Sequence, residues 1–97
     1  MSVLMDVLKE EYDRSKRIVA SIDKELSKLP VGYISKKQIG GHIYYYIQFK
    51  ENGKLKSQYV NKDDALKYNK KVLRRRELLK NKKELLIDQK KIERVLK

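Results

Sequence analysis

A chain of 97 residues allows one domain at most, here taken as 1–97, because hydrophobic cores rarely divide below roughly 100 residues. It is 39% charged with a net charge of +12, and it has no Cys, which excludes disulfides and thiolate metal sites. No apolar run approaches the ~20 residues needed to span a bilayer, and the N-terminus lacks the features of a secretory signal. We therefore expect a cytoplasmic protein without a membrane partner.

The positive charge is unevenly distributed. Residues 1–29 contain six basic and six acidic residues, residues 30–62 contain six Lys and one Glu, and residues 63–97 contain thirteen basic and six acidic residues. The excess lies entirely in the middle and C-terminal parts. Such an imbalance favours a polyanionic partner. The alternative is a charge-rich helix that only keeps the chain in solution.

Residues 1–29 are expected to form a long helix that ends before Pro30. The stretch from Ser2 to Leu29 has no Gly or Pro. Its seam residues recur at the heptad spacing that is typical of a coiled coil, and Ser15 alone breaks their apolar character. This seam predicts pairing with the C-terminal helix or with a second copy. Its positions are Met1, Met5, Leu8, Tyr12, Ser15, Val19, Ile22, Leu26 and Leu29.

Residues 32–60 change to the composition of strands. Runs of β-branched and aromatic residues are separated by Gly40-Gly41 and Asn52-Gly53, both common hairpin turns. The pattern predicts a three-stranded antiparallel meander. With a two-residue turn at Gly40-Gly41, Ile34 lies opposite Ile47.

The register of the third predicted strand depends on the second turn. A two-residue loop, Asn52-Gly53, places Tyr44 and Tyr46 on one face with Leu55 and Tyr59. A three-residue loop that includes Glu51 instead makes one face coherently apolar, and we favour it because register follows the buried face. The apolar face then contains Ile34, Ile43, Tyr45, Ile47, Phe49, Leu55 and Tyr59. The other contains Tyr33, Ser35, Lys37, Tyr44, Tyr46, Gln48, Lys50, Lys54, Lys56 and Gln58.

Residues 63–97 are expected to form a second long helix, with Asn61 or Asp63 as its cap. Its apolar residues recur at intervals of seven from Ala65, with a flanking row formed by Leu78, Leu85 and Ile92. The predicted fold is α+β: a long N-terminal helix, a three-stranded antiparallel sheet and a long C-terminal helix, the two helices paired as a coiled-coil-like hairpin.

Catalysis has few candidate residues. His42 is the only His and lies beside a predicted turn, no cluster has metal-ligand spacing, and no phosphate-binding Gly-rich loop is present. We therefore expect a protein that is not an enzyme and that has no cofactor, metal or small-molecule substrate.

The polar sheet face and the C-terminal helix are the candidate nucleic-acid-binding site. Lys and Arg neutralise phosphates, Tyr stacks on bases, and Gln bonds base edges. The alternative is that a helix covers this face and the tyrosines only pack. The candidate residues are Tyr33, Lys37, Tyr44, Tyr46, Gln48, Lys50, Lys54, Lys56, Lys71, Arg74 and Arg75.

Segments from Leu29 to Leu86 resemble a family of short, uncharacterised prokaryotic and phage proteins. The shared pattern is LP-x-G-x-I-x-x-K at residues 29–37, a YYY strand at 44–46, and G-K-x-K-S-x-Y at 53–59. This resemblance implies the fold and a prokaryotic or phage-infected host cell, but no function.

Residues 61–65, Asn-Lys-Asp-Asp-Ala, are similar to the strand–helix joint of the arm-type DNA-binding domain of phage integrases. That likeness implies a sheet that enters the major groove, with Tyr44, Tyr46, Gln48 and Lys56 as the analogous reading residues. The long N-terminal helix departs from the integrase pattern.

Three functions follow from these patterns. The first is a nucleic-acid-binding module, for DNA rather than RNA. The second is a phage or mobile-element adaptor or inhibitor that binds a protein, for example a host defence nuclease. The third is a homodimeric coiled-coil scaffold.

Overall fold

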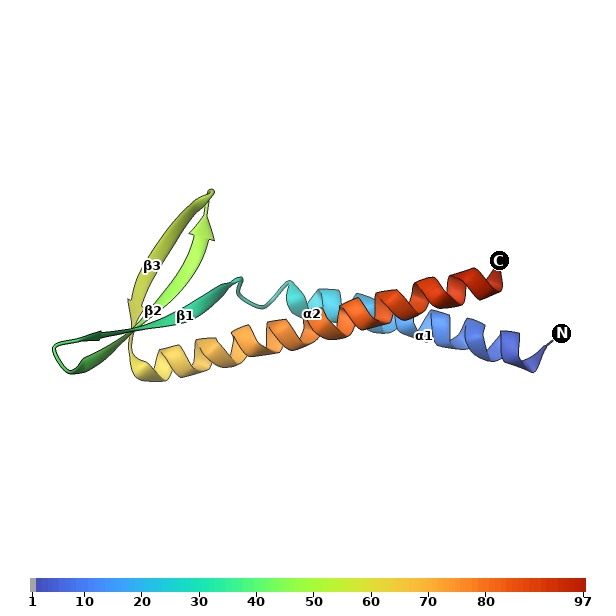
Figure 1. Cartoon of the computed structure of the whole chain (residues 1–97), viewed down its shortest axis with the longest axis horizontal. Helices are drawn as coiled ribbons and strands as arrows, with labels where there is room; N and C mark the ends of the chain where they lie inside the picture. Colours follow the sequence, from blue (N-terminus) through green and yellow to red (C-terminus); the bar gives the residue numbers. More distant parts are fainter. Residues whose placement is uncertain (1) are drawn as a thin grey trace. The chain divides into compact units, whose positions relative to one another are not determined.

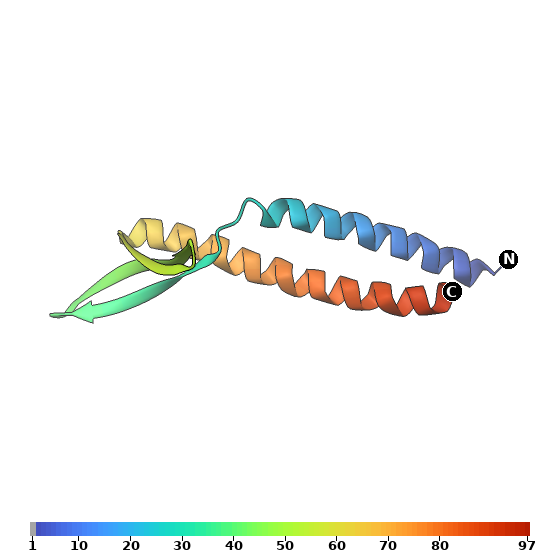
Figure 2. The same ribbon diagram turned by 90° about the horizontal axis from the view of Figure 1, so that it is seen from above.

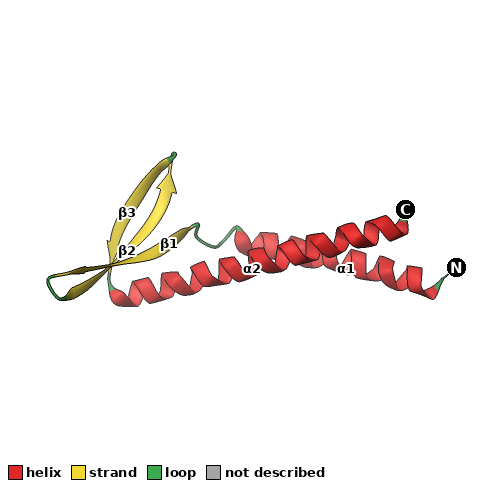
Figure 3. Cartoon of the chain, in the orientation of Figure 1, coloured by secondary structure: helices red, strands yellow, loops and turns green. Residues whose placement is uncertain are grey.

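The computed structural model describes residues 2–97, and it confirms the α+β fold (Figure 1). The elements are α1 (Val3–Leu26), β1 (Gly32–Ile39), β2 (His42–Glu51), β3 (Lys54–Val60) and α2 (Lys62–Leu96) (Figure 3). The described chain divides into two compact units. A hairpin unit contains residues up to Lys28 and residues 77–97, and a sheet unit contains Leu29–Arg76, so that α2 contributes to both.

The helix ends follow from local chemistry. The backbone N–H of Ser27 donates to the carbonyl of Asp23, and the Ser27 hydroxyl donates to the carbonyl of Lys24, 2.7 Å away. α1 thus ends at Leu26, three residues earlier than predicted, in keeping with the aversion of residues before Pro30 to helical geometry. Asn61 caps α2, because its Oδ1 accepts from the backbone N–H of Asp64 at 2.8 Å.

The hairpin unit pairs α1 with the C-terminal part of α2, and Figures 1 and 2 show the two helices side by side. The predicted seam positions from Met5 to Leu26 face α2, with Ile22 buried on α1 and Leu78 buried on α2; Met1 lies outside the described residues, and Leu29 follows the end of α1. The polar interruption at Ser15 is explained by Gln89 Nε2, which donates to Ser15 Oγ at 2.9 Å. Three contacts define the antiparallel register: Tyr12 with Glu93, Ser15 with Gln89, and Asp23 with Lys82.

The apolar rows of α2 differ from the predicted stripe. Ala65 and Val72 are buried in the sheet unit, but Leu79 and Leu86, which continue that row at intervals of seven, are 38% and 40% exposed. Leu78 is instead the buried apolar residue of α2 in the hairpin unit. The flanking row, rather than the row at sevens, therefore packs in the hairpin unit.

The sheet has the strand order β1-β2-β3, and both pairs are antiparallel as predicted. Gly40 and Gly41 have φ of 57° and 81°, which fits a two-residue turn with both central residues left-handed. Ile34 pairs with Ile47, so the predicted β1–β2 register is confirmed.

The predicted register between β2 and β3 is wrong. Glu51 pairs with Lys54, so the loop is the two-residue Asn52-Gly53, with φ of 52° and 78°. Asn tolerates the left-handed region, and a two-residue turn of this kind matches the twist of the flanking strands. The register therefore follows the geometry of the turn rather than the grouping of apolar residues on one face. The exposure that results is considerable, because Leu55 and Tyr59 remain 62% and 58% exposed.

Candidate nucleic-acid interface

The observed register distributes the strands over two faces. The face that packs on α2, here called the helix-covered face, includes Ile34, Lys36, Tyr45, Ile47, Phe49, Lys54, Lys56, Gln58 and Val60. The opposite face, here called the tyrosine face, includes Tyr33, Ser35, Lys37, Ile39, His42, Tyr44, Tyr46, Gln48, Lys50, Leu55, Ser57 and Tyr59.

Contacts within the sheet unit show which face α2 covers. Ile34 and Tyr45 line one cleft together with Ala65 of α2. A Cβ atom on Gly32 would collide with the Tyr68 hydroxyl of α2, so the two segments approach closely. Burial raises the pKa of the Tyr68 hydroxyl. α2 therefore lies on the face that carries Ile34 and Tyr45, and it leaves the tyrosine face open within this unit.

The tyrosine face brings four aromatic rings onto neighbouring strands. The Tyr59 ring lies 6.2 Å from that of Tyr44 and 5.8 Å from that of Tyr46, both in tilted or edge-on geometry. Lys37 Nζ lies 4.8 Å from the centroid of the Tyr46 ring, which is a cation–π contact. Tyr33 is 47% exposed. The Tyr59 ring thus contacts those of Tyr44 and Tyr46, while Tyr33 and Tyr59 keep part of their surface facing outward.

Gln48 occupies the middle of this face. Its Nε2 donates to Ser35 Oγ at 3.2 Å and to Ser57 Oγ at 3.1 Å. Both amide protons are therefore used within the sheet, and only Oε1 is left to accept a hydrogen bond from a ligand. Gln48 can hold the three strands together, but it is poorly suited to the bidentate reading of adenine, which needs a donor and an acceptor.

The predicted lysines separate into two groups. Lys37 and Lys50 lie on the tyrosine face, which contains no Asp or Glu. Lys54 and Lys56 project from the helix-covered face, where Lys56 Nζ pairs with Glu51 Oε2 at 3.0 Å. The observed register therefore removes both of these lysines, as well as Gln58, from the face on which they were predicted. It places Leu55, Ser57 and Tyr59 on that face instead, because the loop has two residues rather than the three that were predicted.

The predicted basic residues of α2 lie in the sheet unit. Lys71 and Arg74 are exposed, and Arg75 is half-buried. Arg75 lines a cleft with Lys50 and Tyr33 of the tyrosine face, so the structure connects one predicted helix residue to the predicted sheet residues. Lys71 is not among the residues that line this cleft.

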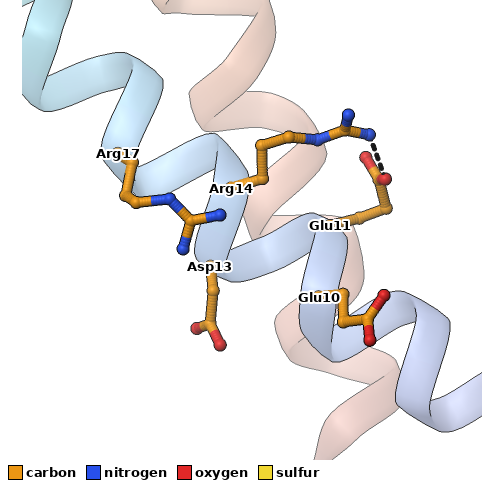
Figure 4. A pocket seen from close by; sticks show the side chains of 5 residues that line it. All are labelled: Glu10, Glu11, Asp13, Arg14 and Arg17. Atoms are coloured by element: carbon orange, nitrogen blue, oxygen red, sulfur yellow. Dashed lines mark hydrogen bonds and ion pairs between the residues drawn. The ribbon is translucent and has the colours of Figure 1, made fainter.

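A second charged cluster, on α1, has a mixed composition. Glu10, Glu11, Asp13, Arg14 and Arg17 lie together on the exposed surface of that helix, and Arg14 pairs with Glu11 (Figure 4). Its three negative and two positive charges nearly cancel, so this cluster produces no strong electrostatic field that would attract a polyanion. In the part of the chain that the structure describes, no group of His, Cys or acidic side chains is arranged to hold a metal ion, and no helix is long and apolar enough to cross a membrane.

A comparison with known proteins identifies the family of this chain. The sequence profile of a domain of unknown function, DUF6788, matches residues 7–75, which is well over half of the chain. The matched segment includes most of α1, the whole sheet and α2 as far as Arg75. No curated protein and no solved structure gives a significant match. The prediction of an uncharacterised family is therefore confirmed, whereas the phage origin and the integrase likeness stay predictions. The chain belongs to the DUF6788 family.

Proposed function

We propose that this protein is a non-enzymatic nucleic-acid-binding module that contacts DNA through the tyrosine face. The observation that carries the proposal is an open sheet face with four Tyr side chains, Lys37 and Lys50, and without a single carboxylate. A ligand with alternating rings and negative charges matches both kinds of side chain.

Each part of the face has a defined contribution. Lys37 and Lys50 neutralise phosphates, and the release of condensed counterions makes the affinity depend on salt. The exposed surfaces of Tyr33 and Tyr59 stack on bases, at about 1–3 kcal/mol per base. Because the amide protons of Gln48 are held by Ser35 and Ser57, we expect weak sequence discrimination.

Charge reversal on the two sheet faces tests this proposal. The variant Lys37→Glu/Lys50→Glu should weaken DNA binding by more than about tenfold and lower the slope of log K against log salt by roughly two, since two phosphate contacts are lost. Fluorescence anisotropy over a salt series measures both quantities, and circular dichroism checks that helicity is kept.

The matched control is Lys54→Glu/Lys56→Glu, which makes the same change of charge on the helix-covered face. We expect it to lower affinity much less, through long-range electrostatics alone. Equal loss in the two double variants would show that net charge, rather than the tyrosine face, carries the binding. Absence of DNA binding by the unmodified chain at low salt would refute the proposal outright.

A protein ligand for the same face is the second candidate. Ile39, Leu55 and Tyr59 are 57%, 62% and 58% exposed on it, and exposed aromatic and aliphatic side chains of this kind serve as anchors at protein interfaces. Such an adaptor would bind its partner with little salt dependence. A capture experiment with the unmodified chain and with Leu55→Glu, at high salt, separates this function from DNA binding.

A further inference from the structure

One cleft of about 300 Å³ joins the tyrosine face to α2 inside the sheet unit. Its lining includes the apolar or aromatic side chains of Val31, Tyr33, Phe49 and Leu55 and the cationic side chains of Lys50, Arg75 and Arg76. No acidic residue lines it. The cleft therefore combines apolar and cationic side chains.

Three of the apolar or aromatic side chains are exposed rather than covered by the chain itself. Val31 is 70% exposed, Tyr33 47% and Leu55 62%. A flat ring can cover such a surface by stacking on Tyr33 while Val31 and Leu55 flank it.

The cationic side chains of the cleft are suited to phosphate. Arg75 and Arg76 are consecutive on α2, and Lys50 approaches from β2. Guanidinium groups bind phosphate through paired hydrogen bonds, and an ammonium group adds a point charge. None of the three forms an ion pair in the described chain, so their charges are available to a ligand.

We propose that this cleft holds one unpaired nucleotide of a bound strand, with the base against Tyr33 and a phosphate between Lys50 and the two arginines. The proposal rests on the proposed function, because Tyr33 and Lys50 belong to both the cleft and the tyrosine face. A base within a duplex is covered on both sides by its neighbours and cannot enter, whereas bases of single strands can be splayed out. The protein should therefore prefer single-stranded DNA, or a duplex with an overhang, to a blunt duplex.

The test compares two fluorescein-labelled probes of the same sequence, a single strand and its blunt duplex, by anisotropy with the full chain. We expect the single strand to bind roughly tenfold more tightly, because the stacking of one base contributes a binding free energy of about this size. Arg75→Ala/Arg76→Ala and, separately, Tyr33→Ala should bring this ratio close to one. Lys67→Ala/Lys70→Ala removes the same charge from exposed positions of α2 outside the cleft, and it should weaken both probes by the same factor and keep the ratio.

Competition identifies what the cleft binds. Deoxyadenosine monophosphate should displace the single-stranded probe at lower concentration than inorganic phosphate does, because only the nucleotide offers a ring to Tyr33. Equal competition by the two, or equal binding of both probes by the unmodified chain, would overturn the cleft proposal while leaving DNA binding by the tyrosine face intact. If neither probe binds, the proposed function fails together with it.

Discussion

Gly32 and Tyr68 illustrate how single residues set the spacing between the sheet and α2. A Cβ atom on Gly32 would lie 2.6 Å from the carbonyl oxygen of Gln48 and would also meet the Tyr68 hydroxyl, so glycine is required there by space. The Gly32 position pairs with Phe49 on the helix-covered face. Burial removes solvent from the Tyr68 hydroxyl, which raises its pKa above the ordinary value of 10.0.

This shift predicts how stability changes at alkaline pH. Because the folded state holds the proton of Tyr68 more tightly than the unfolded state does, the stabilisation is fully present below pH 10.0 and is lost as the pH rises through the raised value. We expect the free energy of unfolding to fall more steeply above this pH in the unmodified chain than in Tyr68→Phe. Urea titrations at several alkaline pH values measure the difference.

The control is Tyr59→Phe, which removes a hydroxyl from a ring that is 58% exposed on the opposite face. It should keep the steep decline. A Tyr68→Phe curve that parallels the unmodified chain would show that burial of this hydroxyl does not contribute to the pH dependence.

At the scale of elements, the pairing of α1 with α2 includes one buried polar contact. Ser15 and Gln89 are each 7% exposed, and Gln89 Nε2 donates to Ser15 Oγ. A polar pair inside an otherwise apolar seam costs desolvation but penalises every other register, because a shift would bury both groups without partners. The hairpin unit is thereby restricted to one alignment.

Substitution of Ser15 tests this function of the pair. Ser15→Ala leaves the Gln89 amide buried without its acceptor and should cost about 1–3 kcal/mol of stability. The double variant Ser15→Ala/Gln89→Leu should recover most of that loss. Denaturation followed by circular dichroism measures both, with Ser21→Ala, at an exposed position of α1, as the control. A double variant that is no more stable than Ser15→Ala would contradict the proposed penalty.

The elements differ in how far the sequence predicts them. The heptad of α1 and the turn at Gly40-Gly41 depend on neighbours in the chain, so local rules were sufficient, and the same rules reduced the cap of α2 to Asn61 or Asp63, of which the structure has Asn61. At Asn52-Gly53, turn geometry predicted a two-residue loop, whereas a coherent apolar face predicted a three-residue loop. The structure has the two-residue loop. The contact of Gln89 with Ser15 could not be predicted, because it requires the alignment of segments far apart in the chain.

The sequence also predicted only part of the composition of the tyrosine face. Strand alternation placed Tyr33, Tyr44 and Tyr46 together correctly, since these lie on the two strands whose register was confirmed. The assignment of Lys54 and Lys56 failed because a change of one residue in a loop turns a whole strand over. The cleft with Arg75 depends on how α2 packs on the sheet, for which the sequence carried no signal.

At the scale of the whole molecule, α2 is the element that both compact units share. It is continuous for 35 residues, and the boundary between the units falls at Arg76 and Glu77 in its interior. Most of the stability of a helix in a protein comes from tertiary packing, so each part of α2 is stabilised by the packing of its own unit, and the unbroken backbone of the helix links the two parts.

Helical continuity predicts cooperative unfolding. The unmodified chain should lose helicity and tyrosine fluorescence in a single thermal transition. Arg76→Gly/Glu77→Gly should separate the two signals, because each Gly weakens the helix by about 1 kcal/mol. Arg76→Ala/Glu77→Ala removes the same side chains but keeps the helix, and should unfold in one step. Two transitions in the alanine variant would indicate that side-chain contacts, rather than the continuous backbone, connect the units.

The strand order β1-β2-β3 leaves β1 and β3 with one unpaired backbone edge each. Such edges invite pairing between separate molecules, and lysines are a common protection against it. Lys36 and Lys37 lie on β1, and Lys54 and Lys56 lie on β3, whereas the central strand carries the three consecutive tyrosines. We therefore expect these lysines to oppose fibrillar aggregation, so that part of the positive charge protects the sheet even when no ligand is bound.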